Sequence, residues 1–379
     1  MNVIFTCGGT GGHINPALAV AKLLRERRPD DNILFVGADD GMERDLVPRE
    51  GFRLETLAVS NFQRKPTPKA LAHNLHAVRT LRRAFRKADA LIKSFAPDVI
   101  LGTGGYASYP MLRQGAKRGV PTAVHESNAI PGLTTKMAAK TASRILVNFE
   151  ESREQYQNQD RVVAVGMPVR QEFLYTTRAE ARKKLGLDER PLVVSYWGSL
   201  GAREMNKKIA DFFLRETEDG DPWQHTHATG SFGWRWMPEF VTEAGVTLAE
   251  HPSISMREYL YDMPLWMNAA DVLICRAGAS TLSEIAMSGT PCILVPSPNV
   301  AANHQEKNAR VLERRGAALV LRESECAGGR LYEAAKALLQ DKPRREAMRT
   351  ALRELAVVDS AERIFNEILE LTRRKVENK

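Results

Sequence analysis

The sequence predicts an α/β protein made of two doubly wound parallel-sheet domains that face each other across a cleft. Short apolar runs alternate with amphipathic stretches along the chain, which is the pattern of βαβ units. The pattern occurs twice, and each time the first apolar run leads into a glycine-rich turn. The chain has 379 residues, which is long for one hydrophobic core and sufficient for two.

In the first half of the chain, apolar runs of strand length alternate with stretches of helical length. The expected strands are 3–6, 33–37, 98–102, 121–125, 144–147 and 162–165. The expected helices include 16–28, 68–94 and 133–140. Ligands of such sheets bind at the carboxyl ends of the strands, so the loops after these runs are the candidate site.

The second half repeats this arrangement. The expected strands are 192–196, 225–228, 246–249, 272–275, 292–295 and 317–321, and the expected helices include 203–215, 281–288, 304–315 and 329–340. The charged stretch 166–190 connects the halves. We therefore expect an N-terminal domain over 1–167 and a C-terminal domain over 168–358. The amphipathic helix 359–376 can pack on either domain, and we assign it to the first.

The composition is that of a soluble protein with buried cores, since 43% of the residues are hydrophobic and 26% are charged. No run approaches the roughly 18 apolar residues of a membrane span, and the N-terminus lacks the basic leader of a signal peptide. The four cysteines have neither C-x-x-C nor zinc-site spacing. Cys7, Cys275 and Cys292 lie in or beside expected strands, which indicates buried free thiols in a reducing cytoplasm.

The basic charge is concentrated in the first half of the chain. Residues 1–170 carry 25 Lys and Arg against 16 Asp and Glu, whereas the remainder carries 29 against 30. In the segment 62–93, nine basic residues accompany the single acid Asp89. Such a face can meet nucleic acid, anionic lipid or an anionic substrate, but no nucleic-acid-binding module accompanies it. We therefore expect no nucleic-acid partner.

Leu71, Leu75, Val78 and Phe85 recur near helical spacing within this basic segment. An apolar stripe of this kind more often faces a core than a membrane. The density of charge instead favours a partly exposed helix. A basic amphipathic helix can lie on an anionic bilayer, so the segment 62–93 is the candidate membrane contact.

The run Gly8-Gly9-Thr10-Gly11-Gly12-His13 follows the first expected strand and precedes a helix. Glycines permit positive φ and the close approach of a ligand to backbone amides, and a helix N-terminus attracts anions. The run matches neither the dinucleotide fingerprint, because Ile14 replaces its third glycine, nor a P-loop. It is interpreted as a phosphate cradle, and the alternative is a tight turn without a ligand. His13 either packs against its helix or acts as a general base.

Two further loops of the first half end neighbouring strands. One is Gly102-Thr103-Gly104-Gly105-Tyr106, and the other is His125-Glu126-Ser127-Asn128. The three loops should emerge at one edge of a parallel sheet, which brings their polar groups together. His125 and Glu126 point to opposite faces if the strand continues through them, so one of them faces the site. Asn128 is either a site residue or a turn residue.

The second half carries a strand, a small-residue loop and a helix at Cys275–Glu284. Thr281 and Glu284 fit a capping box, so Glu284 either caps its helix or accepts hydrogen bonds from a ribose diol. Asn303, His304 and Gln305 open a later helix, where they either read sugar hydroxyls or cap it. Asp219-Gly220-Asp221 formally matches the D-x-D motif of metal-dependent sugar transferases, but its polar setting indicates a surface turn, and we assign no metal.

Taken together, these segments resemble the MurG family. The resemblance runs nearly end to end, and its ordered motifs are highly specific. They are G-G-T-G-G-H at 8–13, G-G-Y-x-S-x-P at 104–110, H-E-x-N-x-x-x-G-L-x-x-K at 125–136, P-V-R at 168–170, C-R-x-G-A-x-T-x-S-E at 275–284, N-H-Q-x-x-N-A at 303–309 and D-S-A-E-R at 359–363. The resemblance implies a GT-B fold of two Rossmann-like domains. It also implies inverting transfer of N-acetylglucosamine (GlcNAc) from UDP-GlcNAc to the 4-hydroxyl of lipid I, which yields lipid II, without metal or cofactor.

The resemblance also assigns residues by matching position. His13 is the implied catalytic base or acceptor contact, with Glu126 as its competitor. Implied donor-binding residues are Thr10, Gly11, Gly12, Asn128, Arg170, Ser199, Leu260, Ala279, Ser280, Thr281, Leu282, Ser283, Glu284 and Gln305. Implied residues for the acceptor pyrophosphate are Gly8, Gly9, Thr103, Gly104, Gly105 and Tyr106. The protein would lie peripherally on the cytoplasmic face of the cell membrane, with segment 62–93 on the anionic inner leaflet.

Three positions depart from the family pattern. Trp197 replaces the first glycine of the loop after the strand 192–196, and Leu200 stands where the family often has Gln. Trp197 must point away from bound phosphates, since its ring would otherwise occlude them. Met167 replaces a common Asn before P-V-R.

Three other functions are compatible with this architecture. A UDP-sugar epimerase would alter the free nucleotide sugar, whereas a transferase leaves it intact until an acceptor is added. A different GT-B UDP-sugar transferase would use another acceptor. A non-catalytic sugar-nucleotide-binding subunit would be expected to lose His13 and Glu284, and both are present here.

Overall fold

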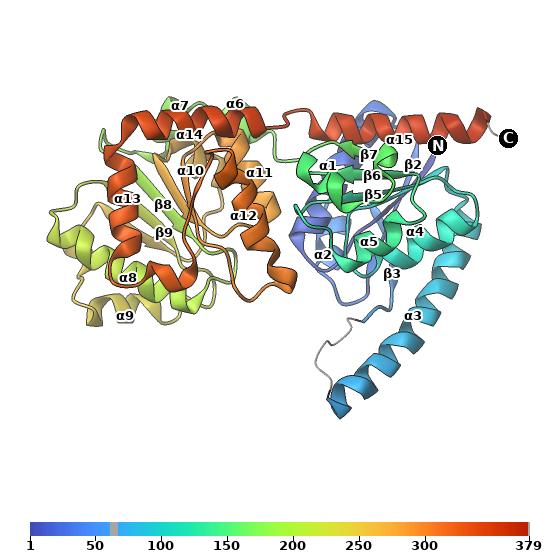
Figure 1. Cartoon of the computed structure of the whole chain (residues 1–379), viewed down its shortest axis with the longest axis horizontal. Coiled ribbons are helices and arrows are strands. Elements are labelled where there is room, and N and C mark those ends of the chain that lie inside the picture. The colour runs from blue at the N-terminus through green and yellow to red at the C-terminus, as the bar shows by residue number, and fades with distance from the viewer. Residues whose placement is uncertain (61–66, 378–379) are drawn as a thin grey trace. The chain divides into compact units, whose positions relative to one another are not determined.

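The computed structural model describes residues 1–60 and 67–377. It divides into two compact units (Figure 1). Unit 1 consists of Met1–Val169 together with Asp359–Lys379, and unit 2 consists of Arg170–Val358. The sequence predicts this boundary after residue 167, with the last helix in the first domain.

Unit 1 is built on a seven-stranded parallel sheet in the order β3-β2-β1-β4-β5-β6-β7. The strands are β1 (Asn2–Thr6), β2 (Asn32–Ala38), β3 (Arg53–Leu57), β4 (Val99–Gly102), β5 (Thr122–Glu126), β6 (Arg144–Val147) and β7 (Val162–Ala164). The strand order reverses between β1 and β4, which is where a doubly wound sheet opens a crevice for ligands.

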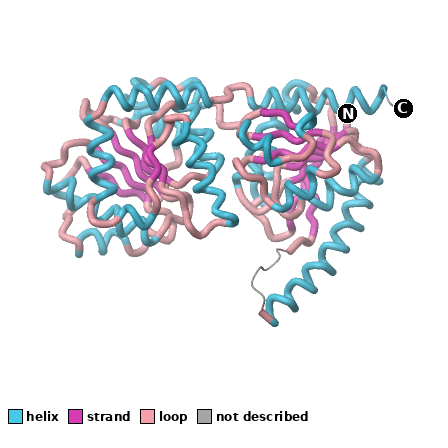
Figure 2. The backbone as a smooth tube through the Cα atoms, viewed as in Figure 1, coloured by secondary structure: helices cyan, strands magenta, loops and turns pink. Residues whose placement is uncertain are grey.

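Helices cover both faces of this sheet (Figure 2). They are α1 (Gly11–Arg27), α2 (Glu43–Arg49), α3 (Pro68–Phe95), α4 (Ser108–Lys117), α5 (Leu133–Ala139) and α15 (Ser360–Glu377). Because side chains alternate along a strand, Val3 and Phe5 of β1 enter the core under α1 and α15, and Ile4 enters the core under α3 and α4. The C-terminal helix α15 contributes Ile364 and Ile368, both fully buried, to the first of these cores.

Unit 2 repeats the design with a six-stranded parallel sheet in the order β10-β9-β8-β11-β12-β13. Its strands are β8 (Leu192–Tyr196), β9 (Gln224–Ala228), β10 (Ile254–Arg257), β11 (Val272–Cys275), β12 (Cys292–Leu294) and β13 (Leu319–Val320). Its helices are α6 (Glu172–Tyr175), α7 (Arg178–Leu185), α8 (Arg203–Glu218), α9 (Met237–Glu243), α10 (Met263–Ala269), α11 (Ala279–Ser288), α12 (His304–Arg314), α13 (Arg330–Gln340) and α14 (Lys342–Leu355).

The predicted fold class of two doubly wound parallel-sheet domains is confirmed. One expected strand is wrong, and two edge strands were not expected where they lie. Residues 246–249 do not form a strand, because Val246 enters the core of unit 2 from a loop and Leu248–Glu250 forms a 3₁₀ turn. The edge strand β10 lies further on, at Ile254–Arg257, and the edge strand β3 at Arg53–Leu57 was missed. Both are short edge strands with mixed polar residues, so their apolar signal is weak.

The four cysteines are free and buried, as predicted for Cys7, Cys275 and Cys292. Burial raises the pKa of the Cys275 thiol to about 12. Across residues 1–60 and 67–377, no helix is both long enough and apolar enough to cross a membrane.

Of the two interpretations of the apolar stripe on α3, the core-facing one is wrong for its first three members, and the partly exposed helix that the charge density favours is present. Leu71, Leu75 and Val78 are exposed. The core face of α3 is instead formed by small residues and Ile92, namely Ala84, Ala88 and Ile92. Residues 62–66 of the basic segment lie outside the described residues.

Candidate active site

The first glycine loop connects β1 to α1 at the carboxyl edge of the unit 1 sheet. Gly9 has a φ of +87°, and α1 begins at Gly11 rather than at the predicted residue 16. Gly11 and Gly12 thus occupy the first turn, where backbone N–H groups have no helical acceptor. Pro16 lies inside α1 and cannot donate to the Gly12 carbonyl. The arrangement leaves amide donors at a helix N-terminus, as an anion site requires.

His13 lies in this first turn, and both its ring and its backbone carbonyl make hydrogen bonds. Its Nδ1 lies 3.1 Å from the Gly8 carbonyl oxygen, and its own carbonyl accepts a hydrogen bond of 2.6 Å from the Thr103 hydroxyl. A carbonyl can only accept, so Nδ1 carries the proton in the neutral ring and Nε2 keeps its lone pair. The half-buried imidazole can therefore accept a proton at Nε2.

The second glycine loop packs directly on the first. Gly104 and Gly105 have φ values of +115° and +85°. A Cβ on Gly105 would lie 2.4 Å from the Gly8 carbonyl oxygen, and one on Gly104 would lie 2.6 Å from Cδ2 of His13. The predicted convergence of these loops is therefore present for Gly8, His13 and Thr103–Gly105, while the Tyr106 side chain is exposed.

The end of β5 places its two ionisable side chains apart. Nε2 of buried His125 donates to the Gly166 carbonyl at 2.8 Å, and burial lowers the pKa of this imidazole. The Glu126 carboxylate instead accepts the backbone N–H groups of Asn128 and Gly132, each at 3.0 Å, and the Asn128 side-chain amide at 3.0 Å. Glu126 thus shapes the turn that carries Asn128.

In unit 2, the loop after β8 repeats the glycine-rich turn. Gly198 and Gly201 have φ values of +88° and +80°. A Cβ on Gly201 would lie 2.0 Å from the Thr229 carbonyl oxygen, so only glycine fits against the loop after β9. Trp197 is buried in the core of unit 2, pointing away from the loop as its size requires, and Ser199 and Leu200 are exposed.

The small-residue loop after β11 opens helix α11. Gly278 is the N-cap and α11 begins at Ala279, so Thr281 lies inside the first turn and the alternative of a Thr281–Glu284 capping box is wrong. Glu284 is half-buried, and burial raises the pKa of its carboxyl to about 7 while the Arg170 guanidinium opposes this shift. When ionised, a carboxylate at this position can accept hydrogen bonds from two hydroxyl groups.

Gln305 and Leu260 complete the residues assigned to unit 2. The side-chain oxygen of half-buried Gln305 accepts the Ser297 N–H at 2.9 Å. The preceding Ala302 and Asn303 are held in the left-handed region, with φ of +54° and +51°. Leu260 is buried after β10.

Two other features are separate from these loops. Asp219 accepts hydrogen bonds from Tyr332 and Lys336, and Asp221 pairs with His251, so the D-x-D carboxylates serve a structural turn.

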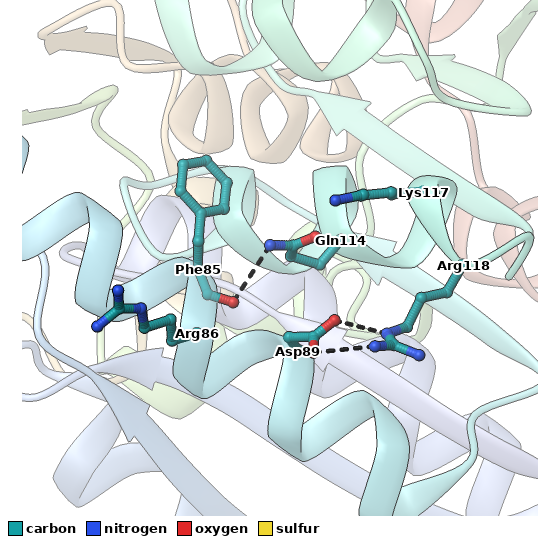
Figure 3. Close-up of a pocket in the computed structure, with 6 residues that line it drawn as sticks. All are labelled: Phe85, Arg86, Asp89, Gln114, Lys117 and Arg118. Atoms are coloured by element: carbon teal, nitrogen blue, oxygen red, sulfur yellow. Dashed lines mark hydrogen bonds and ion pairs between the residues drawn. The ribbon is translucent and has the colours of Figure 1, made fainter.

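A pocket of about 680 Å³ lies between α3 and α4 (Figure 3). The Asp89 carboxylate on α3 binds the guanidinium of Arg118 at 2.6 and 2.9 Å across it. Phe85, Arg86, Gln114 and Lys117 line the rest.

Comparison with known proteins supports one family. The model of the glycosyltransferase family 28 N-terminal domain matches residues 3–147, and that of the C-terminal domain matches residues 193–364. The UDP-N-acetylglucosamine--N-acetylmuramyl-(pentapeptide) pyrophosphoryl-undecaprenol N-acetylglucosamine transferase of Acetivibrio thermocellus is 39% identical over 99% of both chains. The enzyme of the same name from Thermoanaerobacter sp. is 39% identical over 98% of this chain and all of its own.

The chain belongs to the MurG family. The crystal structure of Acinetobacter baumannii MurG has the same fold, with a TM-score of 0.79 at 24% identity over 97% of this chain and 99% of that one. The GT-B architecture implied by the MurG resemblance is thus confirmed.

Proposed function

We propose that this protein transfers GlcNAc from UDP-GlcNAc to the 4-hydroxyl of the muramyl sugar in lipid I, which yields lipid II for peptidoglycan synthesis. Its 39% identity to enzymes of that name over 99% of the chain carries the proposal. It is a hexosyltransferase of the family 28 type. The alternatives of an epimerase, another GT-B transferase and a non-catalytic subunit are not favoured, because relatives at 39% identity over nearly the whole chain carry the transferase name.

The proposed reaction is a direct displacement at the anomeric carbon. The acceptor hydroxyl loses its proton to Nε2 of His13 and attacks the carbon opposite UDP, which inverts the configuration. The carboxylate of Glu126 is already the acceptor of three hydrogen bonds from its own turn. This favours His13 as the base and Glu126 as the residue that positions Asn128.

Charge that develops on the leaving diphosphate needs stabilisation by fixed donors. The first turn of α11 and the loop around Ser199 supply backbone N–H groups at the carboxyl edge of the unit 2 sheet. In this proposal Arg170, Leu260, Ala279–Glu284 and Gln305 hold the donor, joined by Thr10, Gly11, Gly12 and Asn128. Thr103–Tyr106 hold the acceptor pyrophosphate, and Gly8 and Gly9 contribute through their backbone conformation, since the Gly9 N–H donates to the Glu43 carboxylate.

The exposed face of α3 is the proposed contact with the anionic inner leaflet, on the cytoplasmic side of the cell membrane. Leu71 and Leu75 expose 74% and 56% of their surface, and Arg79, Arg82, Arg83 and Arg86 are exposed on the same helix. Apolar side chains beside several arginines suit the boundary between headgroups and acyl chains.

Incubation with labelled UDP-GlcNAc and a lipid I analogue tests the proposed activity. We expect labelled lipid II analogue with an inverted, β linkage, and unchanged UDP-GlcNAc when the acceptor is omitted. Conversion of UDP-GlcNAc by itself would indicate an epimerase, and binding without any turnover would indicate a sugar-nucleotide-binding subunit. Either result would contradict the proposal.

A further inference from the structure

Glu43, the first residue of α2, is completely buried beside the first glycine loop. Its carboxylate accepts two backbone hydrogen bonds. Oε1 accepts the Ala38 N–H at 2.6 Å, and Oε2 accepts the Gly9 N–H at 3.1 Å. A buried carboxylate binds backbone N–H groups strongly, because hydrogen bonds to a charged acceptor are about twice as strong as neutral ones. Glu43 thus ties the glycine loop to the end of β2.

The space around this carboxylate is made by glycines from three segments. A Cβ would lie 3.0 Å from Oε1 at Gly8, 2.3 Å from Cγ at Gly37 and 2.1 Å from Oε2 at Gly41. Side chains at these positions would displace the carboxylate from the Gly9 N–H. The space left by these three glycines therefore fits the Glu43 carboxylate and holds it in one place.

The Gly9 N–H and the Gly8 carbonyl belong to one peptide group. The N–H of this group donates to Glu43, and its carbonyl accepts from Nδ1 of His13 at 3.1 Å. The orientation of the peptide plane therefore links the carboxylate to the imidazole. Because both flanking residues are glycines, the plane has little intrinsic preference and takes its orientation from these partners.

We infer that Glu43 is a positioning residue for His13 and acts through the Gly8–Gly9 peptide group. The carboxylate fixes the peptide plane, the plane presents its carbonyl to Nδ1, and the ring is thereby held with its proton on Nδ1 and its lone pair on Nε2. The hydrogen bonds run in one direction, so each polarises the next. The Gly9 N–H is occupied by Glu43, so Gly9 serves the loop through its conformation. The role of the imidazole as base rests on the proposed function.

The Glu43→Gln variant tests this inference because it keeps the side-chain volume and removes one of the two acceptor oxygens. Its NH₂ group would face the N–H of Gly9 or Ala38, so the peptide plane loses its fixed orientation. Asp98→Asn is the matched control. Its carboxylate accepts the Asn2 N–H at 2.9 Å, at the opposite end of β1 from the glycine loop. Each variant removes a side-chain acceptor for a backbone N–H of unit 1, but only Glu43→Gln alters the peptide group that binds the His13 ring.

Nitrogen NMR of the histidine rings at about pH 8.5, where imidazoles are neutral, reports the tautomer directly. We expect His13 of the native protein, assigned by loss of its signals in His13→Gln, to carry its proton on Nδ1. Glu43→Gln should give a mixture of tautomers and a kcat that is about 10- to 100-fold lower, as for other residues that orient a functional imidazole. The KM for UDP-GlcNAc should change little, since most of the donor contacts lie on unit 2.

Native protein with the His13 proton on Nε2 would overturn the inference, and this measurement needs neither turnover nor a folded Glu43 variant. A Glu43→Gln variant with an unchanged tautomer, and with a loss of kcat equal to that of Asp98→Asn, would overturn it as well. If the native protein has the Nδ1 tautomer but transfers no GlcNAc, the proposed function fails and the positioning of His13 by Glu43 stands.

Discussion

Gly104 and Gly105 have no room for a side chain, because they meet His13 and Gly8 of the first loop. Both were predicted to be glycines of a ligand loop, but the residues that they contact could not be predicted from the sequence. The hydrogen bond between Thr103 and His13 spans 90 residues of sequence, and local composition carries no information about such a contact. At this scale the sequence predicted that these loops converge, whereas their contact residues are determined by the fold.

Gly104→Ala should displace the imidazole of His13, since its Cβ would lie 2.6 Å from Cδ2 and 2.9 Å from Nε2. We expect kcat to fall by about 10²- to 10⁴-fold, the usual contribution of a general base. Gly119→Ala is the control, because Gly119 also has a positive φ, of +70°, but has open space around its Cβ position. Both variants should lose about 1–2 kcal/mol of unfolding free energy from backbone strain. Steady-state kinetics and urea unfolding measure the two effects, and equal kcat values in the two variants would contradict the assigned role of the ring.

Glu284 predicts a pH dependence of donor binding. Burial raises its pKa to about 7, so in the free protein the carboxyl becomes ionised as the pH rises through that value. Only the ionised form can accept hydrogen bonds from both hydroxyls of a ribose. The affinity for UDP-GlcNAc, which has no phosphate that titrates near neutral pH, should therefore rise between about pH 6 and pH 8. Titration calorimetry across this range should show the rise in the native protein and a flat, weaker response in Glu284→Gln. A rise retained in the variant would assign the dependence to another group.

The contact of Glu43 with the first glycine loop could not be predicted from the sequence. Glu43 lies 34 residues from the amide that it binds, within an ordinary acidic helix start. The nearest signal in the sequence is the pair of glycines at 37 and 41, which on their own indicate only a loop. The functional reason for these glycines becomes visible once the carboxylate is seen between them.

Among the elements, the central strands were predicted well and the edges poorly. β1, β4, β8 and β11 are continuous apolar runs because helices cover both faces of each sheet. The edge strands β3 and β10 carry charged residues and were missed or misplaced. Helix α1 begins at Gly11, whereas residue 16 was expected. The early start was missed because the helix opens with two glycines, Gly11 and Gly12, and glycine has poor helix propensity. That first turn is the proposed anion site.

The exposed face of α3 predicts membrane binding by this helix. The double variant Leu71→Ser with Leu75→Ser removes two exposed leucines, each of which would contribute about 1–2 kcal/mol on burial in the acyl boundary. Its binding to vesicles that contain anionic lipid should weaken about 10- to 1000-fold, measured by sedimentation, with unfolding free energy unchanged. Tyr175→Ser, at an equally exposed position of unit 2, is the control and should bind as the native protein does. Equal binding by all three proteins would remove α3 as the membrane contact.

For the whole molecule, the repetition of the βαβ pattern predicted two doubly wound sheets, and the ordered motifs predicted the family. The amphipathic stripe of the last helix fits either core, and the helix was assigned to the first domain. The structure packs α15 on α1, with Ile364, Phe365, Ile368 and Leu371 in the core of unit 1. Arg144 on β6 also pairs with Glu367 and Glu370 of this helix. These contacts join residues more than 200 positions apart, which no local pattern reveals.

Ile368→Ala should therefore destabilise unit 1 and leave donor binding by unit 2 intact. The side chain is fully buried, so its truncation should cost about 2–5 kcal/mol of unfolding free energy. Urea unfolding measures the loss, and calorimetric titration with UDP should give the native affinity under conditions where the variant is folded. A parallel loss of UDP affinity would show that α15 supports the donor site as well.

In the proposed mechanism, backbone amides at the carboxyl edges of the two sheets hold the phosphates of the substrates. A crystal structure of the protein with bound UDP would show whether they do. We expect the diphosphate to lie against the N-terminus of α11 and the loop around Ser199, with the ribose hydroxyls on Glu284. A nucleotide bound away from residues 279–284 would refute the proposed role of these amides.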